Sequence, residues 1–138
     1  MEVRKVMGWL LRACCLVAAM SVVAAPEQQP TVDLAGLQSN AQAGDRVAQY
    51  NLAVIHETGR FGAPLDKAEA ARWYRKSAEQ GYQNAQYNLG VLYLRGEGVE
   101  QDPQAAVHWL RLAAEQRNPA AIAALEKLGV NKPDPAGK

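Results

Sequence analysis

The chain has 138 residues, of which 49% are hydrophobic and 21% are charged, and its formal net charge is +1. This composition fits a single globular domain and excludes a chain that is disordered throughout. The near-zero charge argues against a nucleic-acid-binding surface or a polybasic membrane patch.

Residues 1–24 have the layout of a secretory signal peptide. Basic residues up to Arg12 precede an apolar stretch over residues 13–25 that is interrupted by a single serine. Cleavage after Ala24 avoids placing Pro26 directly after the cut, and the residues at the cut are small. We therefore expect an exported protein that is periplasmic or secreted.

Two other interpretations of this segment are weaker. A membrane-spanning helix needs about 20 apolar residues, but Arg12 leaves only 13 up to residue 25, counting the serine. A lipid anchor on Cys14 is disfavoured because Arg12 is wrong for a lipobox and little apolar sequence precedes it. Signal cleavage removes Cys14 and Cys15, so we expect a mature chain without disulfides or stable membrane insertion. Met1 and Met7 are alternative starts that the sequence leaves open.

An internal repeat organises the rest of the chain. The pentapeptide Ala-Gln-Tyr-Asn-Leu occurs at residues 48–52 and again at residues 85–89, at an offset of 37. Further residues recur at an offset of 36: Asp66, Ala70, Trp73 and Ala78 return as Asp102, Ala106, Trp109 and Ala114. A partial third copy covers residues 121–128, and residues 33–43 are predicted to form the second helix of a degenerate leading repeat.

Capping residues mark where the predicted helices begin and end. Asp66 with Glu69 forms a capping box, and Asp102 precedes a proline in the favoured first-turn position. Asn118 repeats that arrangement for the last helix. Three glycines follow predicted helix ends, where the backbone often turns left-handed: Gly59, Gly81 and Gly96.

The apolar spacing predicts an all-α fold. In each second helix, apolar and small residues at i, i+3, i+4, i+7 and i+8 form one stripe that includes Trp73 or Trp109. A lone hairpin cannot bury the stripes of both its helices, so neighbouring hairpins must cover each other. We predict a short α/α solenoid of antiparallel hairpins over residues 32–130, with two full repeats flanked by half repeats. Residues 25–31 are predicted to be a flexible lead-in and residues 131–138 a disordered tail.

The second repeat unit follows one pattern at many positions: Ala85, Leu89, Gly90, Tyr93, Gly96, Gly98, Val99, Asp102, Ala106, Trp109, Ala113 and Ala114. This pattern resembles the Sel1-like repeat, a relative of the tetratricopeptide repeat with longer loops. The first unit is looser, with Ala53 for the glycine and His56 for the tyrosine, and Arg117 replaces the closing glycine of the second. The resemblance implies a right-handed superhelix with a concave, partner-binding surface, in a family whose members are mostly adaptors.

One side of the two first helices carries the candidate binding residues. A step of 100° per residue places two recurring sets of side chains away from the core. The sets are Tyr50, Val54 and Glu57 in the first unit and Tyr87, Val91 and Leu94 in the second. Tyrosine rings bury a large area while the hydroxyl stays hydrated, which suits an interface anchor. Packing between neighbouring first helices is the alternative, above all for the valines.

Catalysis, a metal and a cofactor are not predicted. His56, at the family's tyrosine position, is expected to pack, and His108 is expected on a solvated helix face. The stretch from Gly96 to Gly98 lacks the preceding strand of a phosphate-binding loop, so an interhelical turn is the better interpretation. The resemblance brings one enzymatic alternative, because a cysteine-rich branch is associated with β-lactam hydrolysis. A mature chain without cysteines does not support it.

These observations predict an exported interaction module, an adaptor or scaffold, that binds another protein. Assembly of an envelope complex is one role for such a module, and an immunity-type inhibitor of a secreted effector is the alternative. A purely structural subunit is left open. Self-association is also left open, because two full repeats are near the minimum for independent stability.

Overall fold

The computed structural model describes residues 32–130, so the predictions for residues 1–24, 25–31 and 131–138 lie outside the described residues. Its helices are α2 (Leu34–Gln42), α3 (Arg46–Thr58), η1 (Arg60–Gly62), α4 (Lys67–Glu79), α5 (Gln83–Arg95), α6 (Pro103–Glu115) and α7 (Pro119–Lys127). Residues 32–130 contain no strand, and the all-α prediction is confirmed. None of the helices in this part of the chain is long and apolar enough to cross a membrane.

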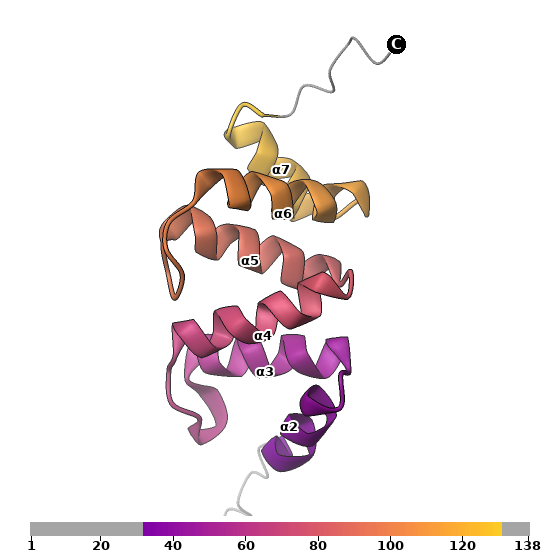
Figure 1. Cartoon of the computed structure of the whole chain (residues 1–138), viewed down its shortest axis with the longest axis vertical. Coiled ribbons are helices and arrows are strands. Elements are labelled where there is room, and N and C mark those ends of the chain that lie inside the picture. The colour runs from indigo at the N-terminus through magenta and orange to yellow at the C-terminus, as the bar shows by residue number, and fades with distance from the viewer. Residues whose placement is uncertain (1–31, 131–138) are drawn as a thin grey trace, which may run out of the picture. The chain divides into compact units, whose positions relative to one another are not determined.

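Consecutive helices pack side by side to form a solenoid (Figure 1). Helices α3 and α4 form one antiparallel hairpin, α5 and α6 form the next, and α4 packs against α5 where the hairpins meet. Helix α2 packs on α3, and α7 packs on α6, as half repeats. The arrangement predicted from the repeat offsets, two full repeats flanked by half repeats, is therefore confirmed.

Small residues lie where the two helices of a hairpin cross. Gly90 of α5 faces Leu110 of α6, and a Cβ atom added to Gly90 would lie 2.9 Å from Leu110 Cγ. Ala53 takes the same repeat position in α3 and is fully buried. The close crossings let the apolar stripes interlock, so Trp73 is only 7% exposed and Tyr74 is fully buried.

The predicted N-cap residues all accept hydrogen bonds from amides of the helix they precede: Asp66, Asp102 and Asn118. The capping box between Asp66 and Glu69 is only half formed, and this part of the prediction is wrong. The Glu69 carboxylate pairs instead with Arg72 at 2.9 Å. The Asp66 amide, which would have donated to Glu69 in a complete capping box, donates instead to His56 O at 2.8 Å. This bond closes the loop between α3 and α4.

The backbone turns left-handed after the helices, as predicted. The φ angles are 65° at Gly59, 81° at Gly81 and 67° at Gly96. Arg117, which takes the repeat position of Gly81, adopts the same conformation with a φ angle of 63°. The structure therefore keeps the turn at a position where the second unit has lost its glycine.

Candidate protein-binding surface

The six predicted binding residues lie on α3 and α5, and each is half-buried. We call them the first-helix face: Tyr50, Val54 and Glu57 of α3 with Tyr87, Val91 and Leu94 of α5. Their partial burial means that stacking of the repeats uses part of this face, which is the alternative that the sequence left open. The α3 half and the α5 half are used in different ways.

The ring of Tyr50 connects the two repeats. Its centroid lies 5.7 Å from that of Tyr74 in α4 and 5.1 Å from that of Tyr82, which immediately precedes α5. Both pairs are tilted, and such aromatic pairs attract each other beyond their area burial. Burial raises the pKa of Tyr50, and the neighbouring Tyr82 raises it further. Buried residues of α2 to α5, among them Leu52, Trp73, Tyr74 and Leu89, form a first core cluster. Tyr50 and Val54 both pack against this first core cluster, so only part of each side chain is left for a partner.

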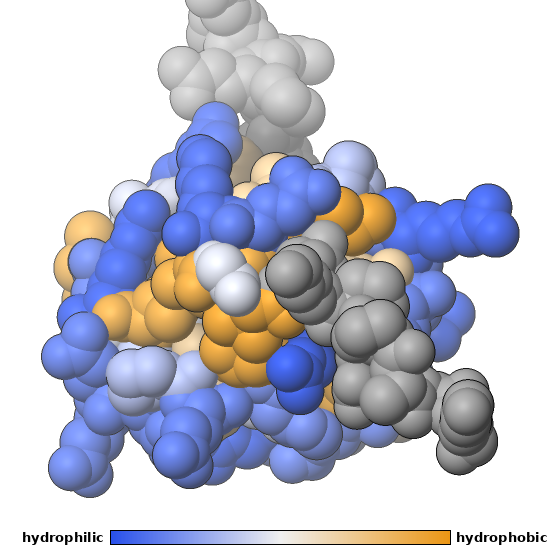
Figure 2. All heavy atoms as spheres, turned by 90° about the horizontal axis from the view of Figure 1, so that it is seen from above, coloured by the Kyte–Doolittle hydropathy of each residue, from blue (hydrophilic) through white to orange (hydrophobic). Residues whose placement is uncertain are grey.

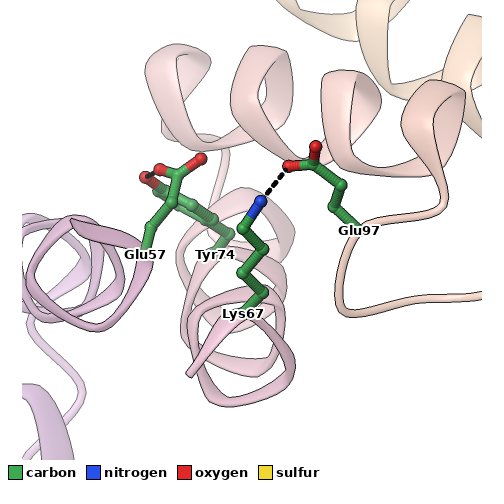
Figure 3. Close-up of polar contacts among 4 residues, drawn as sticks. All are labelled: Glu57, Lys67, Tyr74 and Glu97. Atoms are coloured by element: carbon green, nitrogen blue, oxygen red, sulfur yellow. Dashed lines mark hydrogen bonds and ion pairs between the residues drawn. The ribbon is translucent and has the colours of Figure 1, made fainter. Parts of the chain in front are cut away.

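Glu57 is tied to the same cluster through Tyr74. The Tyr74 hydroxyl donates to the Glu57 carboxylate with an O–O distance of 2.6 Å (Figure 3). Burial raises the pKa of Tyr74 well above its ordinary value, and the hydrogen bond to Glu57 raises it further. The phenol therefore stays protonated and neutral at physiological pH. Among residues 32–130, no cation lies within ion-pair distance of the Glu57 carboxylate.

The α5 half of the first-helix face is apolar. Tyr87 and Leu94 pack against the second core cluster, which includes Leu110 of α6. Leu94 takes the repeat position of Glu57, so the carboxylate of the first unit has an apolar counterpart in the second. Val91 is half-buried but packs against neither core cluster of the described residues.

The histidines and the glycine turn that the sequence singled out lie apart from the first-helix face. Within residues 32–130, no group of three or more histidine, cysteine, aspartate or glutamate side chains can hold a metal ion. His56 and His108 lie in different hairpins, and His108 is exposed on α6 as predicted. His56 is half-buried, and its Nδ1 atom has no hydrogen-bond partner among the described atoms. The stretch from Gly96 to Gly98 forms the predicted interhelical turn.

Two buried glutamines escape the sequence patterns. Gln49 and Gln86 are 5% and 4% exposed. Gln86 Nε2 donates to Ala78 O at 3.2 Å, and its Oε1 accepts from Gln116 Nε2 at 2.8 Å. Gln49 makes the equivalent two bonds in the first unit. The sequence feature that could have indicated their burial is the recurrence of glutamine at the same place in the pentapeptide Ala-Gln-Tyr-Asn-Leu. At a solvent-exposed helix position, any of several polar residues would serve equally well.

Comparison with known proteins places this geometry in context. A family model described as the Sel1 repeat matches residues 46–82 and 83–118, together more than half of the chain. An uncharacterized protein of Neisseria meningitidis serogroup B is 39% identical over 79 residues, which cover 57% of this chain and 16% of that protein. Chitin synthase regulatory factor 2 of Schizosaccharomyces pombe is 31% identical over 85 residues, which cover 62% of this chain and 17% of that factor.

Solved structures are also similar, and one of them carries the comparison. The crystal structure of a Sel1 repeat protein from Oxalobacter formigenes matches with a TM-score of 0.65 and 39% sequence identity. The match covers 67% of this chain and 26% of that protein. The chain thus spans about a quarter of the solved protein and less than a fifth of the two curated relatives.

Proposed function

The chain belongs to the Sel1 repeat family, and on this premise we propose that it is a protein–protein interaction module that binds its partner through the first-helix face. A helical solenoid of this family is consistent with such a module, because stacked helices present an extended surface to a partner. The observation that carries the proposal is a partly exposed strip that recurs in both units. Tyr50 and Tyr87 supply its aromatic anchors.

The two halves of the first-helix face favour different groups on the partner. Tyr87 and Val91 offer an apolar surface for an aliphatic or aromatic stripe. Glu57, without a cation among residues 32–130, favours a basic or hydrogen-bond-donating group. An amphipathic helix with a basic residue near one end satisfies both halves. We assign this module the role of an adaptor in the assembly of an envelope complex.

Partner capture by matched variants tests the proposal. Val91→Glu places a charge on the apolar half, and Tyr87→Ala removes an anchor, so each is expected to lower partner affinity at least about tenfold. Glu115→Ala, on an exposed position of α6, is the control and is expected to leave affinity unchanged. The partner is first identified by affinity capture from the envelope fraction and mass spectrometry. Unchanged affinity for both folded variants contradicts the proposal.

We also propose that the protein is exported, on the support of the basic and then apolar pattern of residues 1–24. The chain expressed with a C-terminal tag is expected in the periplasmic or secreted fraction. Amino-terminal sequencing of that product is expected to begin at Ala25. A purified product that keeps residues 1–24 contradicts this proposal and leaves the binding proposal untouched.

A further inference from the structure

Helix α6 carries a pocket outside the first-helix face, and the described residues that line it all belong to this helix. A cavity of about 450 Å³ lies on this helix, and its lining residues are Pro103, Gln104, Val107, His108 and Arg111. The equivalent surface of α4, in the preceding hairpin, shows which chemical groups a surface of this kind binds. In the preceding hairpin, the α4 positions equivalent to Pro103 and Arg111 are contacted by another part of the chain, whereas Ala68 and Arg72, equivalent to Gln104 and His108, are exposed.

The element that covers α4 is the turn between α5 and α6. Gly98 lies directly on the first turn of α4, where a Cβ atom added to it would lie 2.1 Å from Lys67 O. Only glycine fits so close to a helix backbone, and the φ angle of +71° also favours glycine. Val99, the next residue, packs against the first core cluster, which includes Ala71 of α4.

Two side-chain contacts fix this turn on α4. The Glu97 carboxylate pairs with Lys67 Nζ at 2.7 Å (Figure 3). Two helical turns further along α4, Arg75 donates to the Tyr93 hydroxyl, and its guanidinium lies 5.9 Å from the centroid of that ring. The α4 surface therefore accepts a glycine backbone, an apolar side chain and an aromatic hydroxyl, with an ion pair at one end.

The pocket on α6 is the repeat equivalent of that surface. At an offset of 36, Lys67, Ala71 and Arg75 correspond to Pro103, Val107 and Arg111. Ala71 is 3% exposed, whereas Val107 is only half-buried. Leu128 is 42% exposed, whereas Leu92, at its repeat position, is 1% exposed. Figure 2 looks onto the α7 end of the stack and shows hydrophobic side chains gathered among hydrophilic ones.

The sequence after α7 does not repeat the covering turn. At an offset of 36, Glu97, Gly98 and Val99 correspond to Pro133, Asp134 and Pro135. A side chain at the position of Gly98 would collide with the helix beneath it, and the sequence has an aspartate rather than a glycine at the equivalent position. In a second copy of the chain, the turn between α5 and α6 lies on that copy's own α4, and the turn between α3 and α4 has His56 in place of Tyr93. Neither residues 133–135 nor the turn between α3 and α4 therefore carries both the glycine and the tyrosine of the covering turn.

We propose that the α6 pocket is a second protein-binding site, which accepts a glycine-containing interhelical turn and a tyrosine from a separate helical-repeat protein. The glycine backbone lies on the first turn of α6, an apolar side chain packs on Val107, and the tyrosine hydroxyl accepts from Arg111. Pro103 stands in place of Lys67, so an acidic residue in the turn has no ion-pair partner and is not required. This site is separate from the first-helix face.

A peptide titration tests this proposal with the chain's own turn as the probe. The peptide comprises residues 91–101, closed into a ring so that the turn is preformed. Added to the ¹⁵N-labelled full chain, it is expected to shift the amide signals of Val107, His108 and Arg111. Protein variants Val107→Glu and Arg111→Ala are expected to weaken binding about tenfold, because they block the pocket or remove the donor. Arg72→Ala, an exposed arginine outside the pocket, is the control and is expected to bind normally.

Changes in the peptide separate the turn from the tyrosine. A peptide with Gly98→Ala is expected to lose binding, and one with Tyr93→Phe to bind a few-fold more weakly. Signals that shift on the first-helix face instead, or shifts that survive Val107→Glu, overturn the proposal. A concentration-dependent dimer that covers Val107 and Arg111 also overturns it in favour of a second copy. Because Val91→Glu is the test of the first-helix face, failure of one proposal leaves the other standing.

Discussion

Arg117 occupies a turn position at which its repeat equivalent, Gly81, has no side chain. Both residues have positive φ angles, 63° for Arg117 and 81° for Gly81. A residue with a Cβ atom is about 1–2 kcal/mol less stable than glycine in this region. We expect Arg117→Gly to raise the free energy of unfolding by about 0.5–1 kcal/mol, since the freer unfolded chain offsets part of the gain. Urea unfolding of the two proteins measures the difference.

The control for this prediction is Arg117→Ala. This variant removes the charge but keeps the Cβ atom, so the backbone strain remains and no stabilisation is expected. If both variants gain the same stability, the effect belongs to the arginine side chain, and the backbone explanation is wrong.

Tyr74 is expected to make the free energy of unfolding depend on pH in the alkaline range. Burial, together with the Glu57 carboxylate, raises its pKa in the folded protein above the ordinary value of 10.0. The folded protein therefore holds the phenol proton more tightly than the unfolded chain. Stability is fully present below the unfolded pKa and is lost as the pH rises above it. We expect Tyr74→Phe to flatten this loss above pH ~10, as measured by unfolding at a series of pH values.

Glu57→Gln provides the comparison for Tyr74. It keeps an acceptor for the hydroxyl but removes the negative charge, so the pKa of Tyr74 is expected to fall towards its ordinary value. Absorbance of the phenolate at alkaline pH follows this change. Identical pH dependence in the wild type and in Tyr74→Phe contradicts the assignment.

The candidate site shows what residue patterns predict and what they miss. A step of 100° per residue correctly places Tyr50 and Tyr87 on matching sides of two helices. The same pattern says nothing of what lies opposite each ring, because that depends on how the hairpins are rotated against each other. Tyr50 therefore packs on Tyr74 and Tyr82, contacts that no single-helix periodicity contains.

Gln86 acts as a connector between three consecutive helices. It lies in α5 and hydrogen-bonds to Ala78 in α4 and to Gln116 at the end of α6. Gln86→Leu removes both bonds, although Ala78 O still accepts from the Gly81 amide at 2.9 Å, so we expect a loss of about 1–2 kcal/mol in the free energy of unfolding. Thermal and urea unfolding measure this loss. Gln83→Leu, at the start of the same helix, is the control and is expected to change stability by less than about 0.5 kcal/mol.

Leu89 tests whether α5 is the central helix of the stack. Its side chain is fully buried in the first core cluster. We expect Leu89→Ala to lower the free energy of unfolding by about 2–5 kcal/mol, because it removes buried contacts and leaves a cavity. The same substitution at Leu128, which is 42% exposed, is the matched control and is expected to have a much smaller effect. Equal losses in urea unfolding are incompatible with the observed packing.

At the scale of elements, the sequence predicts nearly everything that is local or repeated. N-caps such as Asp102 and the helix after it follow from short-range signals, and the stacking order follows from the repeat offset. The sequence wrongly predicts a complete capping box at Asp66, because the Asp66 amide donates to His56 across a loop and that bond is not a short-range signal. The α6 pocket is missed for a related reason, since its recognition requires a comparison with the turn that covers α4.

At the scale of the whole described stack, α5 couples the two hairpins. Ala85, Leu89 and Leu92 belong to the first core cluster, whereas Tyr87 and Leu94 pack against the second. One helix thus contributes to both clusters. In a short repeat array the stability of each unit depends on its neighbour, so strong coupling through α5 should make the units unfold together.

The two tryptophans report on different helices, because Trp73 lies in α4 and Trp109 in α6, although Trp109 also packs against the first core cluster. In chains that keep one of them, with Trp9 and the other replaced by phenylalanine, fluorescence is expected to give coincident unfolding transitions. Leu125→Ala, in α7 of the second cluster, is then expected to shift both transitions equally, although Trp73 lies in the first cluster. A shift confined to the Trp109 transition shows that the hairpins unfold independently and that α5 does not couple them.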